Sequence, residues 1–469
     1  MQRAGVVFLS LLAIASSAFG ETFLSVSDIH FNPFADSAIV SKLEAADVSQ
    51  WDAILASSTV TTFSAYGQDM NDPLLRSAIA EMRTQIPSPA FVLISGDFLA
   101  HNFETMYQQT ATDKSQTAYT AFVTKTIAYV ASAFSKAYPG VRIYPTLGNN
   151  DSDCGDYAVA PNGAFLASFR DVWRPIVRSR SFGRRFPTGG YYHADVAGLK
   201  DVRIIALNTN FFSTTYKNPC GTPGPDPGMR ELEWLDGELS VARAEHKRVW
   251  LLFHIPPGID VYDTIKYAGT CPNVTPPTFW KDQYAQAYLK IAKRHRRTII
   301  GSFAGHTHED EFRIASGDFV HITPSVSPIF GNNPAFEIVD VDRTGRIGGY
   351  TTWNLPAVTL PWTREYAFGE AYAKSAYDTA TLTALAAAIG SDSATRAKYF
   401  RYFSSGSAKS TADALAAWQG YWCGLTAMSS AAFTTCYCGP GHGIRGQGLG
   451  TNVPSPAFSG GHRTSSFSP

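Results

Sequence analysis

Short apolar runs alternate with longer helix-like stretches from residue 22 to about residue 355. Helical spacing is clearest at 72–82, 117–138 and 228–245. Runs that are apolar along their whole length are typical of strands buried on both faces, so the alternation predicts an α/β sandwich. The six strand-like runs are TFLSVS (22–27), AFVLIS (90–95), VRIYPTL (141–147), VRIIALN (202–208), RVWLLF (248–253) and TIIGSF (298–303).

Three more strand-like runs follow in quick succession: EFRIAS (311–316), DFVHITP (318–324) and FEIVDVD (336–342). Their close spacing predicts an antiparallel meander and therefore mixed sheets. Beyond residue 357 the composition turns to Ala, Tyr and Phe, with helical spacing at 379–389 and 412–422. We expect a main domain over 21–357 and a small helical region over 358–438 whose aromatic residues pack against it. The Gly/Ser/Pro-rich segment 439–469 is predicted to be disordered.

The first 20 residues have the pattern of a secretory signal peptide. Arg3 precedes an apolar run, small residues follow, and cleavage is expected after Gly20. A membrane anchor is the alternative, but this run and every later one are short for crossing a bilayer. We expect a soluble protein that is secreted or periplasmic.

The charge balance argues against nucleic acid as a partner. Lys+Arg and Asp+Glu both number 39, so the formal net charge is zero. A nucleic-acid-binding surface needs a basic excess or a basic stripe. The single basic cluster, KRHRR at 293–297, ends a helix-like run, where such residues ordinarily complement the helix dipole.

Export changes how the six cysteines are interpreted. Their even number and loop-like positions predict disulfides rather than zinc ligands in an oxidising compartment. Spacing leaves the connectivity open. We expect Cys220 to pair with Cys271 and one local bridge to form among Cys423, Cys436 and Cys438, with Cys154 unassigned.

Metal-capable side chains follow five of the apolar strands, at the carboxyl edge where α/β sheets bind ligands. A single Asp after a strand is usually a turn or cap residue, and a single His is usually a core or surface residue. Five such positions in succession make a shared metal site far better supported than coincidence. The residues are Asp28, His30, Asp97, Asn149, His254, His306 and His308.

Carboxylate, amide oxygen and imidazole ligands suit borderline divalent ions, and no thiolate is among them. Zn²⁺ is the expected metal, with Mn²⁺ or Fe²⁺ as alternatives. Seven ligands with one shared carboxylate are enough for two ions.

The ordered motif DIH, GD, GNND, H and GHTH resembles the signature of the calcineurin-like metallophosphoesterases. It is most similar to the acid sphingomyelinase-like phosphodiesterase branch, through GDFLAH, AGHTHEDEF, TPSVSPIFGNNPAF and the Cys-bearing helical C-terminal region. The resemblance implies a metallophosphoesterase-type β-sandwich flanked by helices. It also implies a first metal held by Asp28, His30, Asp97 and His308, and a second held by Asn149, His254, His306 and a bridging Asp97.

The resemblance implies hydrolysis of a phosphate ester by metal-activated water. Much of the family has a histidine after the motif asparagine, whereas this chain has Asn150, which cannot donate a proton at a useful pKa but can hydrogen-bond a phosphoryl oxygen. His101 is then the candidate general acid, by its match to the GDxxxH histidine of the branch, with a surface loop histidine as the alternative. Asp151 is a candidate for orienting a neighbouring ligand.

The substrate stays open between small phosphodiesters and polyphosphate. The GNND motif also resembles endopolyphosphatase-like relatives, but the neutral net charge gives no support for a basic channel. A lipid substrate, or transient contact with a membrane surface, would benefit from apolar loops, for which the candidates are those around Phe211, Phe212 and Phe330. We favour phosphodiester hydrolysis, with sphingomyelin, other phosphocholine esters and nucleotides unresolved.

A non-catalytic secreted binding protein on the same scaffold is the alternative of another class. All seven inferred ligands are present, which argues against loss of catalysis, and Asn150 is the one sign in its favour.

Overall fold

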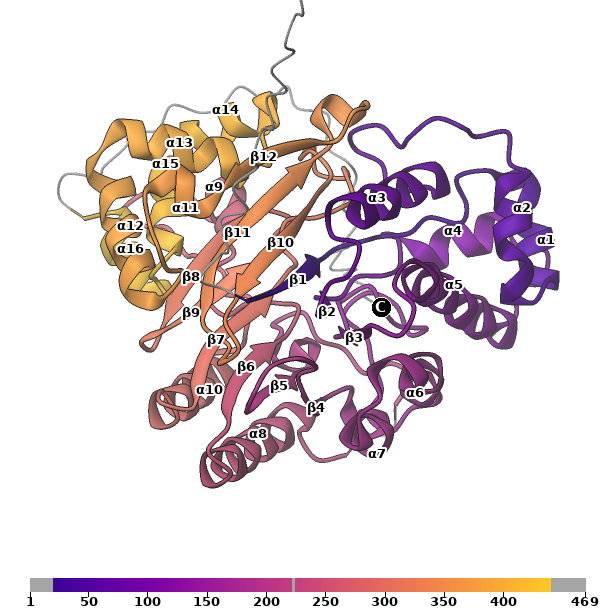
Figure 1. Cartoon of the computed structure of the whole chain (residues 1–469), viewed down its shortest axis with the longest axis horizontal. Helices are drawn as coiled ribbons and strands as arrows, with labels where there is room; N and C mark the ends of the chain where they lie inside the picture. Colours follow the sequence, from indigo (N-terminus) through magenta and orange to yellow (C-terminus); the bar gives the residue numbers. More distant parts are fainter. Residues whose placement is uncertain (1–19, 222–223, 440–469) are drawn as a thin grey trace, which may run out of the picture.

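The computed structural model describes residues 20–221 and 224–439, and two six-stranded sheets form its centre (Figure 1). In the first sheet, three neighbouring strands run parallel and the others are antiparallel. Its order is β12 (Thr363–Ala367), β11 (Ile347–Asn354), β10 (Ala335–Val341), β1 (Glu21–Val26), β2 (Phe91–Ile94) and β3 (Arg142–Pro145).

The second sheet has a parallel centre with one antiparallel strand at each edge. Its order is β4 (Tyr192–Asp195), β5 (Val202–Ala206), β6 (Arg248–Leu252), β7 (Ile299–Ala304), β9 (Asp318–Ile322) and β8 (Glu311–Ala315).

Aromatic side chains fill the space between the two sheets. Phe23 of β1 lies 5.5 Å from Trp250 of β6 and 5.7 Å from Phe303 of β7, measured between ring centroids. Phe91 of β2 stacks on Phe23 and also reaches Trp250. All four rings are buried, and edge-on contacts of this kind add to the stabilisation from burial alone. This layer fixes the two sheets against each other and so places their strand ends.

Helices cover the outer faces of both sheets (Figure 1). Helix α6 packs against β3 on one side of the sandwich, and α8 packs against β5 and β6 on the other. The helices that precede β7 in the chain are α1 (Val40–Ala45), α2 (Trp51–Ala56), α3 (Asp72–Gln85), α4 (Phe103–Thr110), α5 (Gln116–Ala137), α6 (Ala164–Val177), α7 (Arg180–Gly189), α8 (Pro227–Ala244), α9 (Val261–Tyr267) and α10 (Asp282–Arg294).

The C-terminal helices pack against the edge formed by β8, β9 and β11. Tyr402 stacks on Tyr366 of β12 at a centroid distance of 3.8 Å, and Tyr399 meets Phe312 of β8 edge-on. The expected packing of these aromatic residues is therefore confirmed. The helices are α11 (Phe368–Tyr372), α12 (Thr379–Ser391), α13 (Ser393–Phe403), α14 (Ala408–Ala416), α15 (Trp418–Gly424) and α16 (Ser430–Tyr437).

The predicted α/β class and the nine predicted strands are confirmed, as β1–β3 and β5–β10. The predicted meander is wrong, because β8 and β9 form a hairpin in the second sheet while β10 crosses to the first and pairs with β1. Strands β4, β11 and β12 were not predicted, because their sequences are polar or contain glycine. The first sheet also continues to Ala367, so the predicted boundary at residue 357 falls between β11 and β12.

The disulfides correct one pairing and confirm another. Cys154 pairs with Cys220, Cys271 with Cys438, and Cys423 with Cys436. The expected Cys220–Cys271 bridge is wrong because Lys217, close to Cys220, pairs with Ala158 and draws that loop to the segment that holds Cys154. The expected local bridge is the one between Cys423 and Cys436.

No helix among the described residues has the length and apolarity needed to cross a bilayer. The predicted signal peptide lies outside the described residues except for Gly20, and so does the predicted disordered tail except for Gly439.

A buried carboxylate ties the segment after β7 to the first sheet. Asp310 accepts hydrogen bonds from the hydroxyls of Tyr350 (2.8 Å), Thr352 (3.0 Å) and Tyr366 (2.7 Å) on β11 and β12. Its backbone N–H donates to the carbonyl of Phe403 at the end of α13. One residue therefore joins the second sheet's connecting loop, the first sheet and the C-terminal helices.

We predict that Asp310→Ala lowers the free energy of unfolding by about 3 kcal/mol, because three buried hydroxyls lose their acceptor. Thermal unfolding followed by circular dichroism measures this. The matched control is Asp413→Ala, which removes an exposed ion pair to Lys409 and is expected to cost less than about 1 kcal/mol. Equal losses in the two variants would contradict the role of Asp310.

Candidate metal centre

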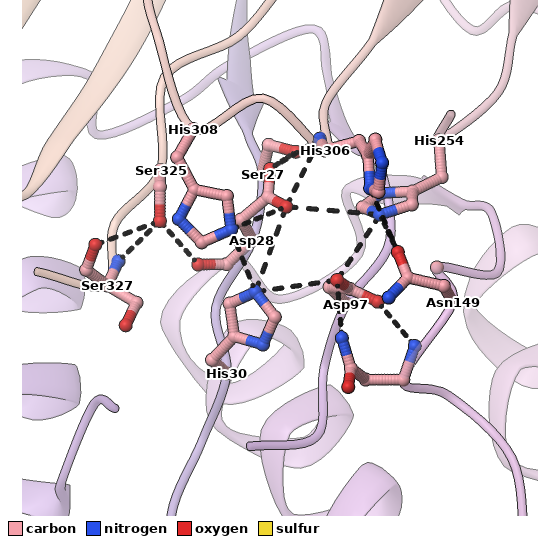
Figure 2. A network of polar contacts seen from close by, with 12 residues as sticks. Ser27, Asp28, His30, Asp97, Asn149, His254, His306, His308, Ser325 and Ser327 are labelled. Carbon is pink, nitrogen blue, oxygen red and sulfur yellow. Dashed lines mark hydrogen bonds and ion pairs between the residues drawn. The ribbon is translucent and has the colours of Figure 1, made fainter. Parts of the chain in front are cut away.

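All seven predicted metal ligands lie together where the carboxyl ends of strands from both sheets meet (Figure 2). The first sheet contributes the residues after β1, β2 and β3, and the second contributes those after β6 and β7. These strands run parallel within each sheet, so their ends share one edge. The side chains are Asp28, His30, Asp97, Asn149, His254, His306 and His308.

One group of side chains gathers around Asp28 and His30. His308 Nε2 lies 3.1 Å from His30 Nε2 and 3.4 Å from Asp28 Oδ1. His30 Nε2 is 3.4 Å from Asp97 Oδ2. Asp28, His30 and Asp97 together present three donor atoms at a spacing that a single metal ion can bridge. With His308, these three residues make up the set expected for the first metal.

A second group gathers around Asn149. Its Oδ1 lies 3.0 Å from His254 Nε2 and 2.9 Å from His306 Nδ1. His254 Nε2 is also 3.2 Å from Asp97 Oδ2. Asp97 therefore contacts both groups, and His306 and His308, two residues apart on one turn, face different groups.

The loops that carry these residues have a strained backbone. Non-glycine residues rarely adopt positive φ, and such strain concentrates at functional sites. Gly305 is required beside them, since a Cβ there would lie 2.0 Å from Ser27 Oγ and 2.7 Å from Asp28 Oδ2. The positive-φ ligands are Asp28 (51°), His30 (46°), Asp97 (57°), His306 (77°) and His308 (65°).

Backbone carbonyls orient two of the imidazoles. His30 Nδ1 lies 2.9 Å from the carbonyl oxygen of Leu99, and His254 Nδ1 lies 2.7 Å from that of Ser95. An Nδ1–H that donates to a carbonyl leaves the Nε2 lone pair directed at the centre. This is the arrangement that metal-bound histidines ordinarily have.

The electrostatics of the centre are those of buried carboxylates among imidazoles. Burial lowers the pKa of His30 and His254, but the surrounding carboxylates, Asp97 foremost and Asp28 next, together outweigh it and raise the pKa values to about 10 and about 9. Burial would raise the pKa of Asp97, yet His254 and His30 hold it well below its usual range. The carboxylates thus draw positive charge into the centre.

These residues fit divalent cations. Asp28 and Asp97 are buried and have no Lys or Arg partner anywhere in the described ranges 20–221 and 224–439. Buried charge of this kind needs compensation, and protons and metal ions compete for the same imidazole lone pairs. The oxygen and imidazole donor set favours borderline divalent metals.

Asn150 and Asp151, the two residues after Asn149, both form hydrogen bonds with Asp97. Asn150 donates its backbone N–H to Asp97 Oδ1 (2.9 Å) and its Nδ2–H to Oδ2 (3.0 Å). Asp151 accepts the backbone N–H groups of Asp97 (2.8 Å), Phe98 (2.6 Å), Leu99 (3.2 Å) and Gly148 (2.8 Å). Burial and the Asp97 carboxylate raise the pKa of Asp151 to about 7. Asp151 therefore contacts the backbone of Asp97, a predicted ligand, as expected of a residue that orients a neighbouring ligand.

His101 lies at the edge of the first group. Its ring stacks on His30 at a centroid distance of 4.1 Å, and Phe330 meets it edge-on at 5.5 Å. Its Nδ1 lies 2.9 Å from Asp69 Oδ1. The placement is that of a residue facing the centre rather than of an isolated surface histidine.

Sequence reasoning missed three residues that contact the predicted site. Asp69 bonds His101, Asp156 accepts a hydrogen bond from Asn149 Nδ2 (2.8 Å), and the Tyr157 hydroxyl lies 3.4 Å from His306 Nε2. Asp156 and Tyr157 lie five and six residues after the end of the GNND segment (148–151), so their nearness in sequence was the available signal. Asp69 had none, because it lies between strands and far along the chain from His101.

The apolar rim expected from the sequence is only partly present. Phe211 and Phe212 are buried in the core, because Phe211 packs on Tyr216 and Phe212 on Trp280. Phe330 is 37% exposed and packs edge-on against His308 at 4.5 Å. Of the three aromatic residues proposed, Phe330 alone therefore presents its ring beside the centre.

No family model matches the chain. Among solved structures, a dimetal phosphatase from Danio rerio is 13% identical, with a TM-score of 0.41 over 74% of this chain and 99% of that one.

Characterised relatives are more informative. The chain is 27% identical to sphingomyelinase phosphodiesterase D of Dictyostelium discoideum over 78% of this chain and 84% of that protein. It is 26% identical to acid sphingomyelinase-like phosphodiesterase 3b of Homo sapiens over 92% of this chain and 93% of the other. It is also 26% identical to the cyclic GMP-AMP phosphodiesterase SMPDL3A of Rattus norvegicus, over 61% of this chain and 65% of that protein.

The three alignments cover between 61% and 92% of this chain. They agree with the motif resemblance found in the sequence and with the gathering of its residues in space. The chain is therefore similar over most of its length to acid sphingomyelinase-like phosphodiesterases, the same branch of the calcineurin-like metallophosphoesterases that its motifs resemble.

Proposed function

We propose that this protein is a secreted phosphodiesterase that hydrolyses small phosphodiesters at a centre of two divalent metal ions. The observation that carries the proposal is the arrangement of seven donor side chains in two groups that share Asp97. His30 and His308 would serve one ion and His254 and His306 the other. Zn²⁺ is the metal that this donor set favours.

Bound divalent ions supply Lewis-acid activation of water and of phosphoryl oxygens. The chain's own residues hold that chemistry in place. Asp97 lies between the two groups, and Asn150 fixes both of its oxygens. Asn150 therefore acts on Asp97 rather than as a proton donor.

His101 is the proposed general acid. It lies beside the first group, with a ring nitrogen within 4.8 Å of ring nitrogens of His30 and His308. A leaving oxygen with a high pKa needs a proton as its bond to phosphorus breaks, and histidine can donate one near neutral pH.

The relatives leave two substrate types in view, sphingomyelin-like lipids and cyclic dinucleotides. Hydrolysis of sphingomyelin, 2′,3′-cyclic GMP-AMP, p-nitrophenyl phosphate and polyphosphate, measured at acidic and neutral pH, separates them. Faster turnover of either phosphodiester than of the other two supports the proposal. Preferred cleavage of polyphosphate would favour a phosphoanhydride hydrolase instead.

Metal analysis with bis-(p-nitrophenyl) phosphate as substrate tests catalysis against the binding-protein alternative. We expect about two metal ions per chain, and hydrolysis that chelation abolishes and added Zn²⁺ restores. A protein that holds two ions and hydrolyses nothing in this panel would contradict the proposed function.

We predict that Asp97→Ala lowers kcat/KM for bis-(p-nitrophenyl) phosphate by at least about 10³-fold, because both groups lose a ligand. Metal content per chain, measured by mass spectrometry, should fall in the same variant. The control is Asp171→Ala, at an exposed residue of α6 that pairs with Arg170, and it should behave as wild type. Near-normal turnover by Asp97→Ala would refute the shared role of Asp97.

We predict that His101→Ala slows phosphodiesters with alkyl leaving groups by about 10²-fold and p-nitrophenyl esters by less than about threefold. The reason is that p-nitrophenolate leaves without a proton. Steady-state rates across a series of leaving groups measure the difference. His246→Asn, at an exposed position with φ of 57° that asparagine tolerates, is the control and should change neither rate. Equal slowing of both ester types would remove His101 from this role.

A further inference from the structure

Asp69 holds His101 with both of its carboxylate oxygens. Oδ1 lies 2.9 Å from His101 Nδ1, and Oδ2 accepts the backbone N–H of His101 at 2.9 Å. The side chain of Asp69 is buried, and His101 is the partner of its carboxylate in both hydrogen bonds. A carboxylate used twice on one histidine fixes both the position of that residue and the direction of its ring.

The segment that carries Asp69 is itself fixed against the metal centre. The Ser64 hydroxyl donates to the Asp69 carbonyl at 2.7 Å. The next residue, Met70, exchanges backbone hydrogen bonds with His30 and Asn32, so this segment lies alongside the loop that follows β1. Two backbone hydrogen bonds at Met70 therefore tie the segment that carries Asp69 to the ligand loop.

Two neighbouring rings, those of His30 and Phe330, hold the His101 ring in one orientation. His30 stacks on it with an interplanar angle of 25°, and Phe330 contacts it edge-on. With Nδ1 directed at Asp69, Nε2 is the nitrogen through which the ring can meet a substrate oxygen. An imidazole that donates from Nδ1 to a carboxylate keeps its other nitrogen available for proton transfer, as in the Ser-His-Asp triad.

We propose that Asp69 is the positioning residue for proton donation by His101: it keeps a proton on Nδ1 and aims Nε2 at the leaving oxygen. This inference rests on the proposed function for its catalytic meaning. In the step it serves, water forms the new bond to phosphorus as the bond to the leaving oxygen breaks. The attacking water releases one proton to solvent, the electron pair of the broken bond goes to the leaving oxygen, and the His101 imidazolium gives that oxygen its Nε2 proton, which leaves the ring neutral with its Nδ1–H on Asp69.

Asp69→Asn separates this role from a purely structural one. The amide oxygen can still accept the backbone N–H of His101, and its NH₂ group then donates to Nδ1. That places the ring proton on Nε2 of a neutral imidazole, a much weaker acid than an imidazolium. The same exchange in a catalytic triad preserves geometry while holding the wrong tautomer.

The kinetic test compares Asp69→Asn, His101→Ala and the double variant on alkyl and p-nitrophenyl phosphodiesters. We expect Asp69→Asn to slow the alkyl ester by about 10²-fold through kcat, with p-nitrophenyl esters nearly unchanged. The double variant should be no slower than His101→Ala alone, because the two residues act as one unit. Additive losses would overturn the proposal.

The matched control is Asp72→Asn, a buried carboxylate three residues away that pairs with Arg76 and the Tyr129 hydroxyl. It does not contact His101, so we expect a lower melting temperature with the leaving-group dependence of wild type. The same kinetic pattern in Asp72→Asn and Asp69→Asn would mean that general destabilisation, not positioning, is being measured, and would overturn the proposal.

A second readout does not depend on catalysis. In protein labelled with ¹⁵N-histidine, long-range proton–nitrogen correlation spectra report which ring nitrogen carries the proton. In spectra recorded at a pH where the imidazole is neutral, we expect Nδ1–H for His101 in the native chain and Nε2–H in Asp69→Asn. Nε2–H in the native chain would overturn the proposal even if the protein is an active phosphodiesterase. The expected tautomers in a protein without activity would leave the positioning intact and count against the proposed function alone.

Discussion

Two carboxylates, Asp28 and Asp97, are buried at the junction of the sheets with imidazoles as their counterions. Desolvated negative charge is costly unless it is compensated at close range. The strand-end loops satisfy this requirement by converging, and they accept positive φ at five ligand positions to do so. The charge that makes the centre costly to fold is the same charge that suits it to divalent cations.

The scaffold behind these carboxylates is unusually polar for buried structure. The Asp151 carboxylate accepts hydrogen bonds from four backbone N–H groups, and Asn150 donates a hydrogen bond to each carboxylate oxygen of Asp97. The carboxylates of Asp97 and Asp151 thus have hydrogen-bond donors before any ion or substrate is considered, which preorganises Asp97. Asn150, which departs from the common family motif, helps to fix the Asp97 carboxylate, and this role is compatible with catalysis.

The C-terminal helices contribute to the same region indirectly. Asp310, two residues after His308, is tied to β11, β12 and the end of α13. The histidine turn is therefore anchored on both sides, by β7 before it and by this network after it.

The sequence by itself determined the strands that carry the site, since fully apolar runs such as 248–253 have one stable environment, a sheet buried on both faces. It also determined which side chains would gather, because polar residues at the ends of parallel strands share one edge. Edge strands with polar or glycine-containing sequence, such as β12, escaped detection because their pairing comes from neighbours and not from their own pattern. Tertiary structure alone decided the transfer of β10 to the first sheet, the Cys154–Cys220 pairing and the contact between Asp69 and His101. In each case the partners are distant in sequence, and only the packed fold brings them within bonding distance.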